Sequence, residues 1–436
     1  MTGPAAPPVG SRYADLTRAQ LAVVVPELLL IGQLIDRSGM AWCISAFGRE
    51  EMARIAIEEW AGASPIYTRR MQQALGYAPE VAGEGDVVTI FKGLQLDIGA
   101  PPQFMDFRYQ VRDRWHGSFH LDHCGALMDV EPMGPEYVRS MCHDIEDPTF
   151  DATAVATNPR AQVRPLHRPP RVPADRAPHC AWTVVIDPAH PPVEPLAPYH
   201  RIVTTAAAGL ALDPVPASTD PEVEGWSDYA GPLLDDLDFT RFSHAALVRI
   251  ADEVCLQMHL LNLSFVLAVR ARCTSEEQAR AICRKQLVGI AGLAAERLAR
   301  ALGLGTTPAD AVRVLAMHPL LNPLPYAPAD LDPATARATV RPGPAHGDDG
   351  WLTLCGPATP ADPEAPSALQ ALVRGVDPRL DVEVEPAAEG DGEGWSLRVV
   401  QREDPAAEAG EVAVTRFSTG AGFVFEPRRS LPLLIG

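Results

Sequence analysis

The feature that most restricts the fold is an internal resemblance between two long segments. Residues 49–77 and 276–304 align without gaps, and both are amphipathic with the period of a helix. Another apolar helical segment precedes each of them, at residues 21–47 and 245–271. The aligned segments share Glu50/Glu277, Ile55/Ile282, Gly62/Gly289, Arg70/Arg297 and a closing Ala-Leu-Gly at 74–76 and 301–303. This self-similarity predicts two tandem, diverged repeats, each opening with a helical hairpin.

Short segments after the first hairpin are expected to form a small, mainly antiparallel sheet. Residues 85–97, 116–124 and 179–187 are typical of strands. A helix is expected to begin at Gly134-Pro135 and to stop at Pro148. The predicted fold class is α+β, with a hairpin and a sheet in each repeat. We expect a flexible N-terminal tail over residues 1–15, a first half over 16–204, a Pro-, Ala- and Asp-rich linker over 205–236 and a second half over 237–436.

The two halves differ in chemistry downstream of their hairpins. The alignment continues by placing Cys124 opposite Cys355, and "DPTFD" at 147–151 opposite "DPRLD" at 377–381. It then sets Cys142, His143 and Asp144 against Leu372, Val373 and Arg374. Side chains that can ligate or transfer protons are therefore replaced in the second half. We interpret that half as a degenerate copy kept for packing.

The charge and the cysteine content exclude several classes of function. The net charge of −19 repels the phosphates of nucleic acids and anionic lipid, so neither is expected as a partner. The most apolar stretch, residues 21–35, is too short and too interrupted to span a bilayer. Eight cysteines in 436 residues do not make a disulfide scaffold, and no export signal is visible. We expect a cytoplasmic protein, in which clustered cysteines more often bind metal or react.

Cysteine and histidine are concentrated in one part of the first half. Eight of the twelve histidines lie between His116 and His200, and three of them adjoin a cysteine. The candidate ligands for one transition metal ion, zinc or iron, are His120, His123, Cys124, Cys142, His143, His179 and Cys180. Strand alternation puts His120 and Cys124 on one face and His123 on the other, so a single site would use either the cysteines or the histidines. The alternative interpretation is that these cysteines are small buried hydrophobic residues without a metal.

Charged residues beside the cluster suggest proton transfer and anion binding. Asp144 follows Cys142 and His143, an arrangement suited to acid–base work or to an activated thiol. An acidic surface turn before Pro148 is the alternative. Arg164 and Arg171 belong to a locally basic stretch that could hold an anionic small substrate, or could form ordinary surface ion pairs.

The order of these residues resembles the family of L-2-amino-thiazoline-4-carboxylic acid hydrolases. The resemblance covers about residues 16–187 and consists of Cys124, then "CHD" at 142–144, then "HCAWTVV" at 179–185 with Trp182. The closing strand also resembles small ligand-binding domains of the 4-vinyl reductase type. The family's first cysteine is usually followed by proline, where this chain has Gly125.

The resemblance implies hydrolysis of a C–N bond in a small cyclic amidine or a related heterocycle. A Cys124 thiolate or a metal-bound water would attack, and Cys142, His143 and Asp144 would complete the catalytic group. Arg164, Arg171 and Trp182 would bind the substrate. Two other classes stay open: a metal-dependent oxidoreductase using iron or copper, and a non-catalytic protein that binds a small molecule or a metal. An internal duplication often replaces a homodimer, so a monomer or a homodimer is expected.

Overall fold

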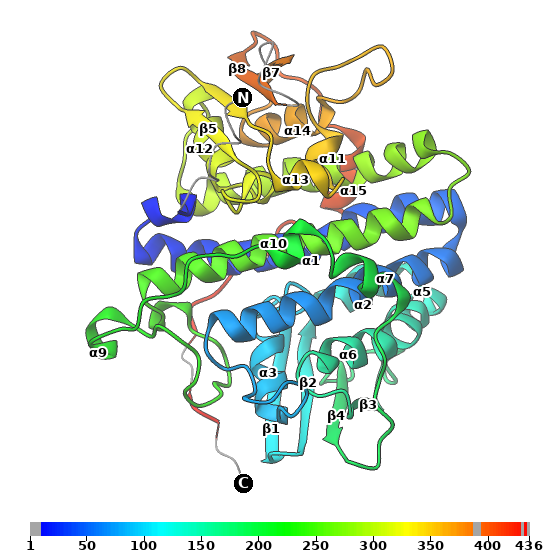
Figure 1. The fold of residues 1–436 in the computed structure, drawn as a ribbon. Helices are drawn as coiled ribbons and strands as arrows, with labels where there is room; N and C mark the ends of the chain where they lie inside the picture. The colour runs from blue at the N-terminus through cyan, green and yellow to red at the C-terminus, as the bar shows by residue number, and fades with distance from the viewer. Residues whose placement is uncertain (1–9, 387–393, 429–430, 434–436) are drawn as a thin grey trace.

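The chain folds as a layer of long helices between two antiparallel sheets, which confirms the α+β class. The computed structural model describes residues 10–386, 394–428 and 431–433. Figure 1 shows one sheet on each side of the helical layer. The layer consists of α1 (Arg18–Phe47), α2 (Arg49–Ala74), α10 (His244–Arg270) and α11 (Glu276–Leu302).

Three of the four long helices, α1, α10 and α11, begin at a side-chain cap. Thr17 and Gln20 form a capping box at the start of α1, and Ser243 and Ser275 cap α10 and α11 with their hydroxyls. Gly303 ends α11 in the left-handed region, where a side chain would be strained. Both predicted hairpins are therefore present as helix pairs.

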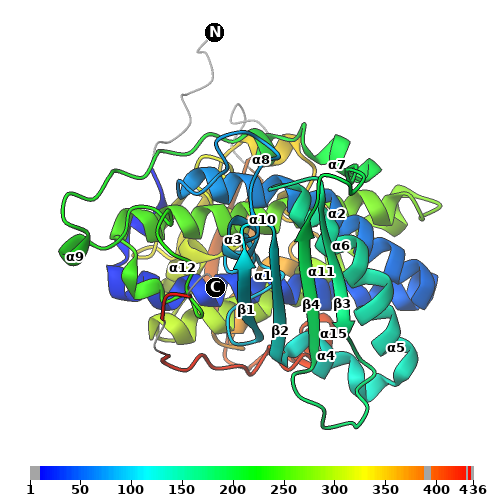
Figure 2. The same ribbon diagram turned by 90° about the horizontal axis from the view of Figure 1, so that it is seen from below.

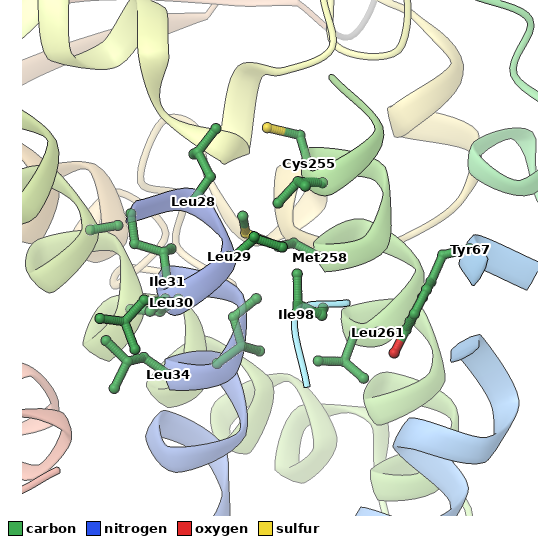
Figure 3. Close-up of a cluster of buried hydrophobic side chains, with 14 of the residues drawn as sticks. Leu28, Leu29, Leu30, Ile31, Leu34, Tyr67, Ile98, Cys255, Met258 and Leu261 are labelled. Carbon is green, nitrogen blue, oxygen red and sulfur yellow. The ribbon is translucent and has the colours of Figure 1, made fainter. Parts of the chain in front are cut away.

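The helices of the two hairpins interleave, and each helix of one hairpin packs against a helix of the other. Helix α1 packs against α11 and α10, and α10 packs against α2. Figure 3 shows the apolar side chains of α1 and α10 meeting in the centre, beside Ile98 and Tyr67. Buried apolar residues of both halves belong to one continuous core. Helices α1 and α10 are also long and apolar enough to cross a membrane, a test that core helices of a folded protein pass as well.

The two sheets have the same strand order. The first sheet is β1-β2-β4-β3, and Figure 2 shows it in front of the long helices. The second is β5-β6-β8-β7. The strands are β1 Met105–Asp113, β2 His116–Cys124, β3 Ala161–His167, β4 Cys180–Ile186, β5 Ala329–Asp332, β6 Arg337–Val340, β7 Leu380–Pro386 and β8 Trp395–Gln401. The strands predicted at 116–124 and 179–187 are confirmed.

One predicted strand is wrong, and one predicted helix ends later than expected, each for a local reason. Residues 85–97 contain a helix, α3 (Val87–Leu94), because Asp86 caps it and its apolar residues recur at helical spacing. The helix over 134–147 does not stop at Pro148. It runs from α5 (Pro135–Arg139) through a π-helical turn, η3 (Ser140–Ile145), into α6 (Glu146–Val155). Pro148 lies in the first turn of α6, where its missing N–H is not required.

Parts of the expected tail and linker are folded. Residues 1–9 lie outside the described residues, but Arg12–Asp15 form a short 3-10 helix, η1. Its Tyr13 is fully buried and donates its hydroxyl hydrogen to the Met317 carbonyl, at 2.8 Å. In the expected linker, the Tyr229 side chain is buried and donates a hydrogen bond to Gln95. Both segments are therefore held by contacts with the core.

The remaining helices are short and lie around the sheets. They are α4 Gly125–Val130, η2 Glu131–Met133, α7 Ala197–Ile202, α8 Ala206–Gly209, α9 Pro221–Glu224, η4 Phe239–Arg241, α12 Pro308–Met317, η5 Pro319–Leu321, α13 Pro344–Gly347, η6 Trp351–Leu354, α14 Ser367–Val376 and α15 Gly410–Arg416. Two of them matter for the site, because α4 and α15 help to close it.

Candidate functional site

A large pocket lies between the first helical hairpin and the first sheet. Its volume is about 630 Å³, within the range of sites for small organic ligands. Most of its lining is apolar, with methionines and aromatic rings from α1, α2, β1, α4, η3 and α6. Val414, Phe417, Ser418 and Thr419 come from α15 and the residues after it, so the second half of the chain completes the pocket. Asp129 holds this segment by accepting hydrogen bonds from Ser418 and Thr419.

The charged groups of the pocket are mostly acidic. Four carboxyl groups and one guanidinium line it: Asp36, Asp97, Asp129, Glu146 and Arg37. Carboxyl groups in an apolar cavity are rare unless they are paired, because burial removes their hydration. The partners of each one therefore decide what the pocket can bind.

Asp97 is the most informative of these residues. Its side chain is buried, and its Oδ1 accepts hydrogen bonds from the Tyr67 hydroxyl, at 2.9 Å, and from the Gly99 N–H, at 2.7 Å. Burial raises the pKa of Asp97 to about 6, while these two hydrogen bonds hold it down. The carboxyl group is thus mostly ionised at pH 7. No Lys, Arg or His of the described residues forms an ion pair with it.

Asp36 and Arg37 form a second polar group, on α1. Arg37 makes an ion pair with Asp36, at 3.0 Å, and the indole of Trp60 donates a hydrogen bond to the same carboxylate, at 3.3 Å. The Arg37 Nε has no hydrogen-bond partner within the described part of the chain. The side-chain oxygens of Gln33 and Ser140 are also buried in the lining without partners there. Several buried polar atoms around the pocket therefore lack a hydrogen-bond partner within the described residues.

Glu146, in the first turn of α6, adds a proton donor. Burial and, to a lesser extent, the neighbouring charge of Asp147 raise its pKa to about 8, although Arg168 acts to lower it. The group is mostly protonated at pH 7, and its Oε2 is buried without a partner among the residues described. A neutral carboxyl group in a pocket can donate a hydrogen bond or a proton.

The three predicted cysteines come together, but behind the pocket wall. Cys124, Cys142 and Cys180 are all buried, and none of them lines the pocket. Burial raises the pKa of Cys124 to about 12 and those of Cys142 and Cys180 well above the usual range, with Glu146 adding to each effect. Thiols with such pKa values are protonated at neutral pH and react poorly. These three side chains belong to the buried apolar core.

A β-bulge explains why strand alternation misplaced Cys124. Between Cys124 and Leu121 strand β2 uses one residue more than β1 does opposite it. The extra residue turns Cys124 toward the buried face, whereas His120 stays on the other face and contacts Asp122, at 3.3 Å. The rings of His123 and His179 lie 6.0 Å apart, and burial lowers the pKa of both. The cysteines and these histidines therefore form two separate groups.

The other predicted residues have partners outside the pocket. His143 bonds through its Nε2 to the Pro169 carbonyl, at 2.6 Å, and Asp144 is exposed. Arg164 pairs with Asp151 and Arg171 with Glu131. Trp182 is fully buried among Phe119 and Phe150. None of these predicted residues lines the pocket.

The described residues contain no group of three or more His, Cys, Asp or Glu side chains arranged to hold a metal ion. The predicted zinc or iron ligands are thus divided between the thiol group, the histidine pair and single surface contacts.

Sequence reasoning missed Asp36, Arg37 and Asp97. A signal for the first two was present, because Gln33, Asp36, Arg37 and Met40 follow an apolar run at helical spacing. Charged side chains on the face of a helix that should be buried indicate a polar site within the core. Asp97 carried no such signal, since it lies in a turn that the sequence assigned to a strand.

Comparison with family models, with curated proteins and with solved structures finds no match to this chain.

Proposed function

We propose that the first-half pocket binds a small, mainly apolar molecule that carries a protonated nitrogen, such as an amine or an amidine. The apolar lining supplies binding through the burial of the ligand's surface. The lining has four carboxyl groups against one guanidinium, and even with Glu146 mostly protonated its charge favours a cation over an anion. The pocket aromatics, including Trp60 and Phe107, add favourable faces for a cationic group.

The observation that carries this proposal is the state of Asp97. A carboxylate that is ionised, buried and without an ion pair among the described residues destabilises the free protein. A protonated nitrogen bound beside its Oδ2 would supply the missing partner. Hydrogen bonds from Tyr67 and Gly99 hold the carboxylate in place for that contact.

A comparison of the two halves also supports the first-half pocket as the ligand site. We propose that the chain is a fused pair of repeats, because contacts across the halves are reciprocal. When α1 and α10 are aligned from their first residues, Glu27 lies opposite Glu253. The alignment of residues 49–77 with 276–304 sets Arg70 of α2 opposite Arg297 of α11. Glu27 pairs with Arg297, and Arg70 pairs with Glu253. Such exchanged pairs are what a two-fold symmetric dimer produces.

Small residues at the same crossings repeat this reciprocity. Gly62 of α2 lies against Ser264 of α10, and Gly289 of α11 lies against Ser38 of α1. The same alignment pairs Ser38 with Ser264, and the glycines are among the residues that the sequence aligned. A side chain at Gly62 would collide with Ser264, and one at Gly289 would collide with Thr415 of α15 and press on Ser38.

The strand register revises the downstream part of the sequence alignment. Leu121 pairs with Cys180 in the first sheet and Val340 with Trp395 in the second. Matching these two pairs aligns Leu121 with Val340, so Cys124 falls opposite Gly343 instead of Cys355. Likewise, residues 147–151 lie within α6, whereas residues 377–381 run from the end of α14 into β7.

The space equivalent to the pocket is filled in the second half. In the alignment of the helices, Arg37 and Trp60 correspond to Leu263 and Leu287, which are both buried. Gly350 packs on Leu263, and the neighbouring Trp351 is buried with its ring 5.5 Å from that of His259. The first half has an open, charged pocket where the second half buries leucines and aromatic rings, and this difference supports a ligand role for the first half.

Two isosteric probes test the charge preference. 2-Naphthamidine is cationic at neutral pH, and 2-naphthamide has nearly the same shape without the charge. We expect the amidine to bind at least about tenfold more tightly, a difference of about 1.4 kcal/mol. Isothermal titration calorimetry measures both affinities, and a Met52→Trp variant, which narrows the pocket, should weaken both probes. Equal affinities, tighter binding of the amide, or binding of neither probe would contradict the proposal.

A second candidate function is hydrolysis of a C–N bond in a cyclic amidine, the reaction that the family resemblance implies. Glu146 favours it, because a protonated carboxyl group in the pocket can donate a proton to the leaving nitrogen. Water would add to the amidine carbon, and the C–N bond to the departing nitrogen would break as that nitrogen takes the proton. The Cys124 thiol takes no part in this version, since burial keeps it protonated.

Ammonia release tests this second candidate. Hydrolysis of 2-iminopyrrolidine gives 2-pyrrolidinone and ammonia. We expect Glu146→Gln to slow the release by about 100-fold, the usual effect of losing a general acid, and Cys124→Ala to leave it unchanged. An absence of ammonia with the wild-type protein, or full activity of the Glu146→Gln variant, would exclude this reaction.

A further inference from the structure

Asp36 on α1 and Glu59 on α2 form a pair of acidic residues at the wall of the pocket. Asp36 lines the pocket and is buried, and Glu59 on α2 is fully buried. Neither oxygen of Glu59 has a hydrogen-bond partner within the described residues. Asp36, in contrast, is held by Arg37 and Trp60. A fully buried carboxyl group with two unpartnered oxygens needs a functional explanation, because it destabilises the core.

The second half carries uncharged counterparts at the equivalent positions. The alignment of the helices places Asn262 opposite Asp36 and Gln286 opposite Glu59. Both amides are fully buried, and the Asn262 amide donates a hydrogen bond to the Gln286 carbonyl oxygen, at 3.1 Å. The two halves therefore keep a polar pair of the same shape at the same crossing, and only the half with the open pocket has it as acids.

We propose that the Asp36–Glu59 pair couples ligand binding to proton release, with Glu59 giving up its proton when a cation enters the pocket. This inference rests on the proposed function, since it requires a cationic ligand. Glu59 does not touch the ligand, but it acts through Asp36, which lines the pocket. Binding would then be tighter at higher pH, because the proton and the cationic ligand compete.

The charges around Glu59 fit this role. Burial raises the pKa of Glu59 well above the usual range, and the negative charge of Asp36 raises it further. Arg37, next to Asp36 on α1, lowers it. Glu59 in turn raises the pKa values of Cys43 and Tyr67, and the Tyr67 hydroxyl bonds to Asp97. A cation placed at Asp36 or Asp97 therefore acts on Glu59 at short range and favours its ionised form.

Other charged groups near α2 already have partners. Arg272 of α10 pairs with Glu51 and Glu58. Glu253 of α10 pairs with Arg70 and with Arg249. On α6, Asp147 pairs with Arg168 and Asp151 with Arg164. Glu146 of α6 lines the pocket and is also mostly protonated at neutral pH, so it is the group that a test must separate from Glu59.

Calorimetry with 2-naphthamidine tests the coupling. The same titration at pH 7 in phosphate and in Tris, whose ionisation enthalpies differ, gives the number of protons released for each amidine bound. We expect release of about one proton from the wild-type protein, and its loss in Glu59→Gln. Glu146→Gln is the matched control and should keep the release. The double variant Asp36→Asn/Glu59→Gln recreates the amide pair of the second half and provides a folded form without either acid.

The outcomes separate this inference from the proposed function. If the amidine does not bind to the wild-type protein, the proposed function fails. If it binds without releasing protons, or if Glu146→Gln abolishes the release and Glu59→Gln does not, only the coupling is wrong. Thermal melting of each variant checks that the fold is kept.

Discussion

An unpaired carboxylate in an apolar pocket lowers the stability of the protein that holds it. The pKa of Asp97 rises from 3.8 to about 6 in the folded protein, so the folded state binds the proton more tightly than the unfolded chain. Stability from this residue is therefore present below about pH 4 and is lost as the pH rises through about 6. A protein keeps such a residue when a ligand needs it.

Replacing Asp97 by asparagine is expected to stabilise the free protein. The amide keeps an oxygen for the Tyr67 and Gly99 hydrogen bonds and removes the buried charge. At pH 8 we expect the free energy of unfolding to rise by about 1–3 kcal/mol, with little change at pH 4. Urea denaturation at both pH values measures this. A variant less stable than the wild type at pH 8 would show that the carboxylate has a cationic partner.

The cysteine cluster shows what a sequence can and cannot reveal at the scale of a residue. Clustering along the sequence brought Cys124, Cys142 and Cys180 to attention, and they are neighbours in the fold. Their burial and the bulge in β2 depend on the packing of the sheet on α6, which local sequence does not encode. Gly125 is similar, because the Phe104 ring occupies the place of its side chain.

Thiol reactivity checks the assignment of these cysteines to the core. We expect Cys124, Cys142 and Cys180 to react with Ellman's reagent only after unfolding, since burial keeps their thiols protonated. The half-buried Cys273 is expected to react first in the native protein. A fast-reacting thiol that disappears in Cys124→Ala would restore the nucleophile hypothesis.

At the scale of elements, periodicity predicted the long helices but not the short helix α3 or the π-helical turn before α6. Helices α2 and α11 were expected from the residues that the two segments share, and both are present. Residues 87–91, "VVTIF", contain β-branched residues typical of strands, but the Asp86 cap and packing on the core decide for a helix. The π-helical turn before α6 gave no sequence signal at all.

The exchanged ion pairs between long helices are expected to hold the two halves together. Arg297 is fully buried and binds Glu27 together with the carbonyl oxygens of Gly420, Ala421 and Phe423. Arg297→Met leaves Glu27 buried without its partner, so we expect a loss of about 3–5 kcal/mol in unfolding free energy. Chemical denaturation measures it.

The exposed pair between Arg341 and Asp330 is the control for this variant. Arg341→Met is expected to change stability by less than about 1 kcal/mol, because solvent screens the pair. Equal effects of the two substitutions would mean that the cross-half pair contributes no more than a surface contact.

For the molecule as a whole, the sequence predicted two repeats but did not predict how the helices of the two halves pack together. Each half donates its long helices to one shared layer, and residues 414–419 cross over to close the pocket of the first half. Contacts between residues so far apart in sequence follow from the three-dimensional packing, and no local pattern reports them. The pocket could therefore not be predicted as a unit.

Splitting the chain tests whether each half needs the other in order to fold. Residues around 211–220 are mostly exposed, so a cut after Pro216 leaves the core helices intact. We expect fragments 1–216 and 217–436 each to lack cooperative unfolding alone, and to regain it when they are expressed together. Circular dichroism during thermal melting reports this. Cooperative unfolding of fragment 1–216 by itself would show that the first half is an independent domain.

The central claim is that Asp97 receives the protonated nitrogen of a ligand, and one measurement tests it most directly. The affinity of 2-naphthamidine is determined by calorimetry for the wild-type protein and for Asp97→Asn, with 2-naphthamide as the uncharged reference. We expect the substitution to weaken the amidine by at least about tenfold and to leave the amide nearly unchanged. If the Asp97→Asn variant binds the amidine as tightly as the wild type, Asp97 is not the partner of the ligand and the proposed function loses its main support.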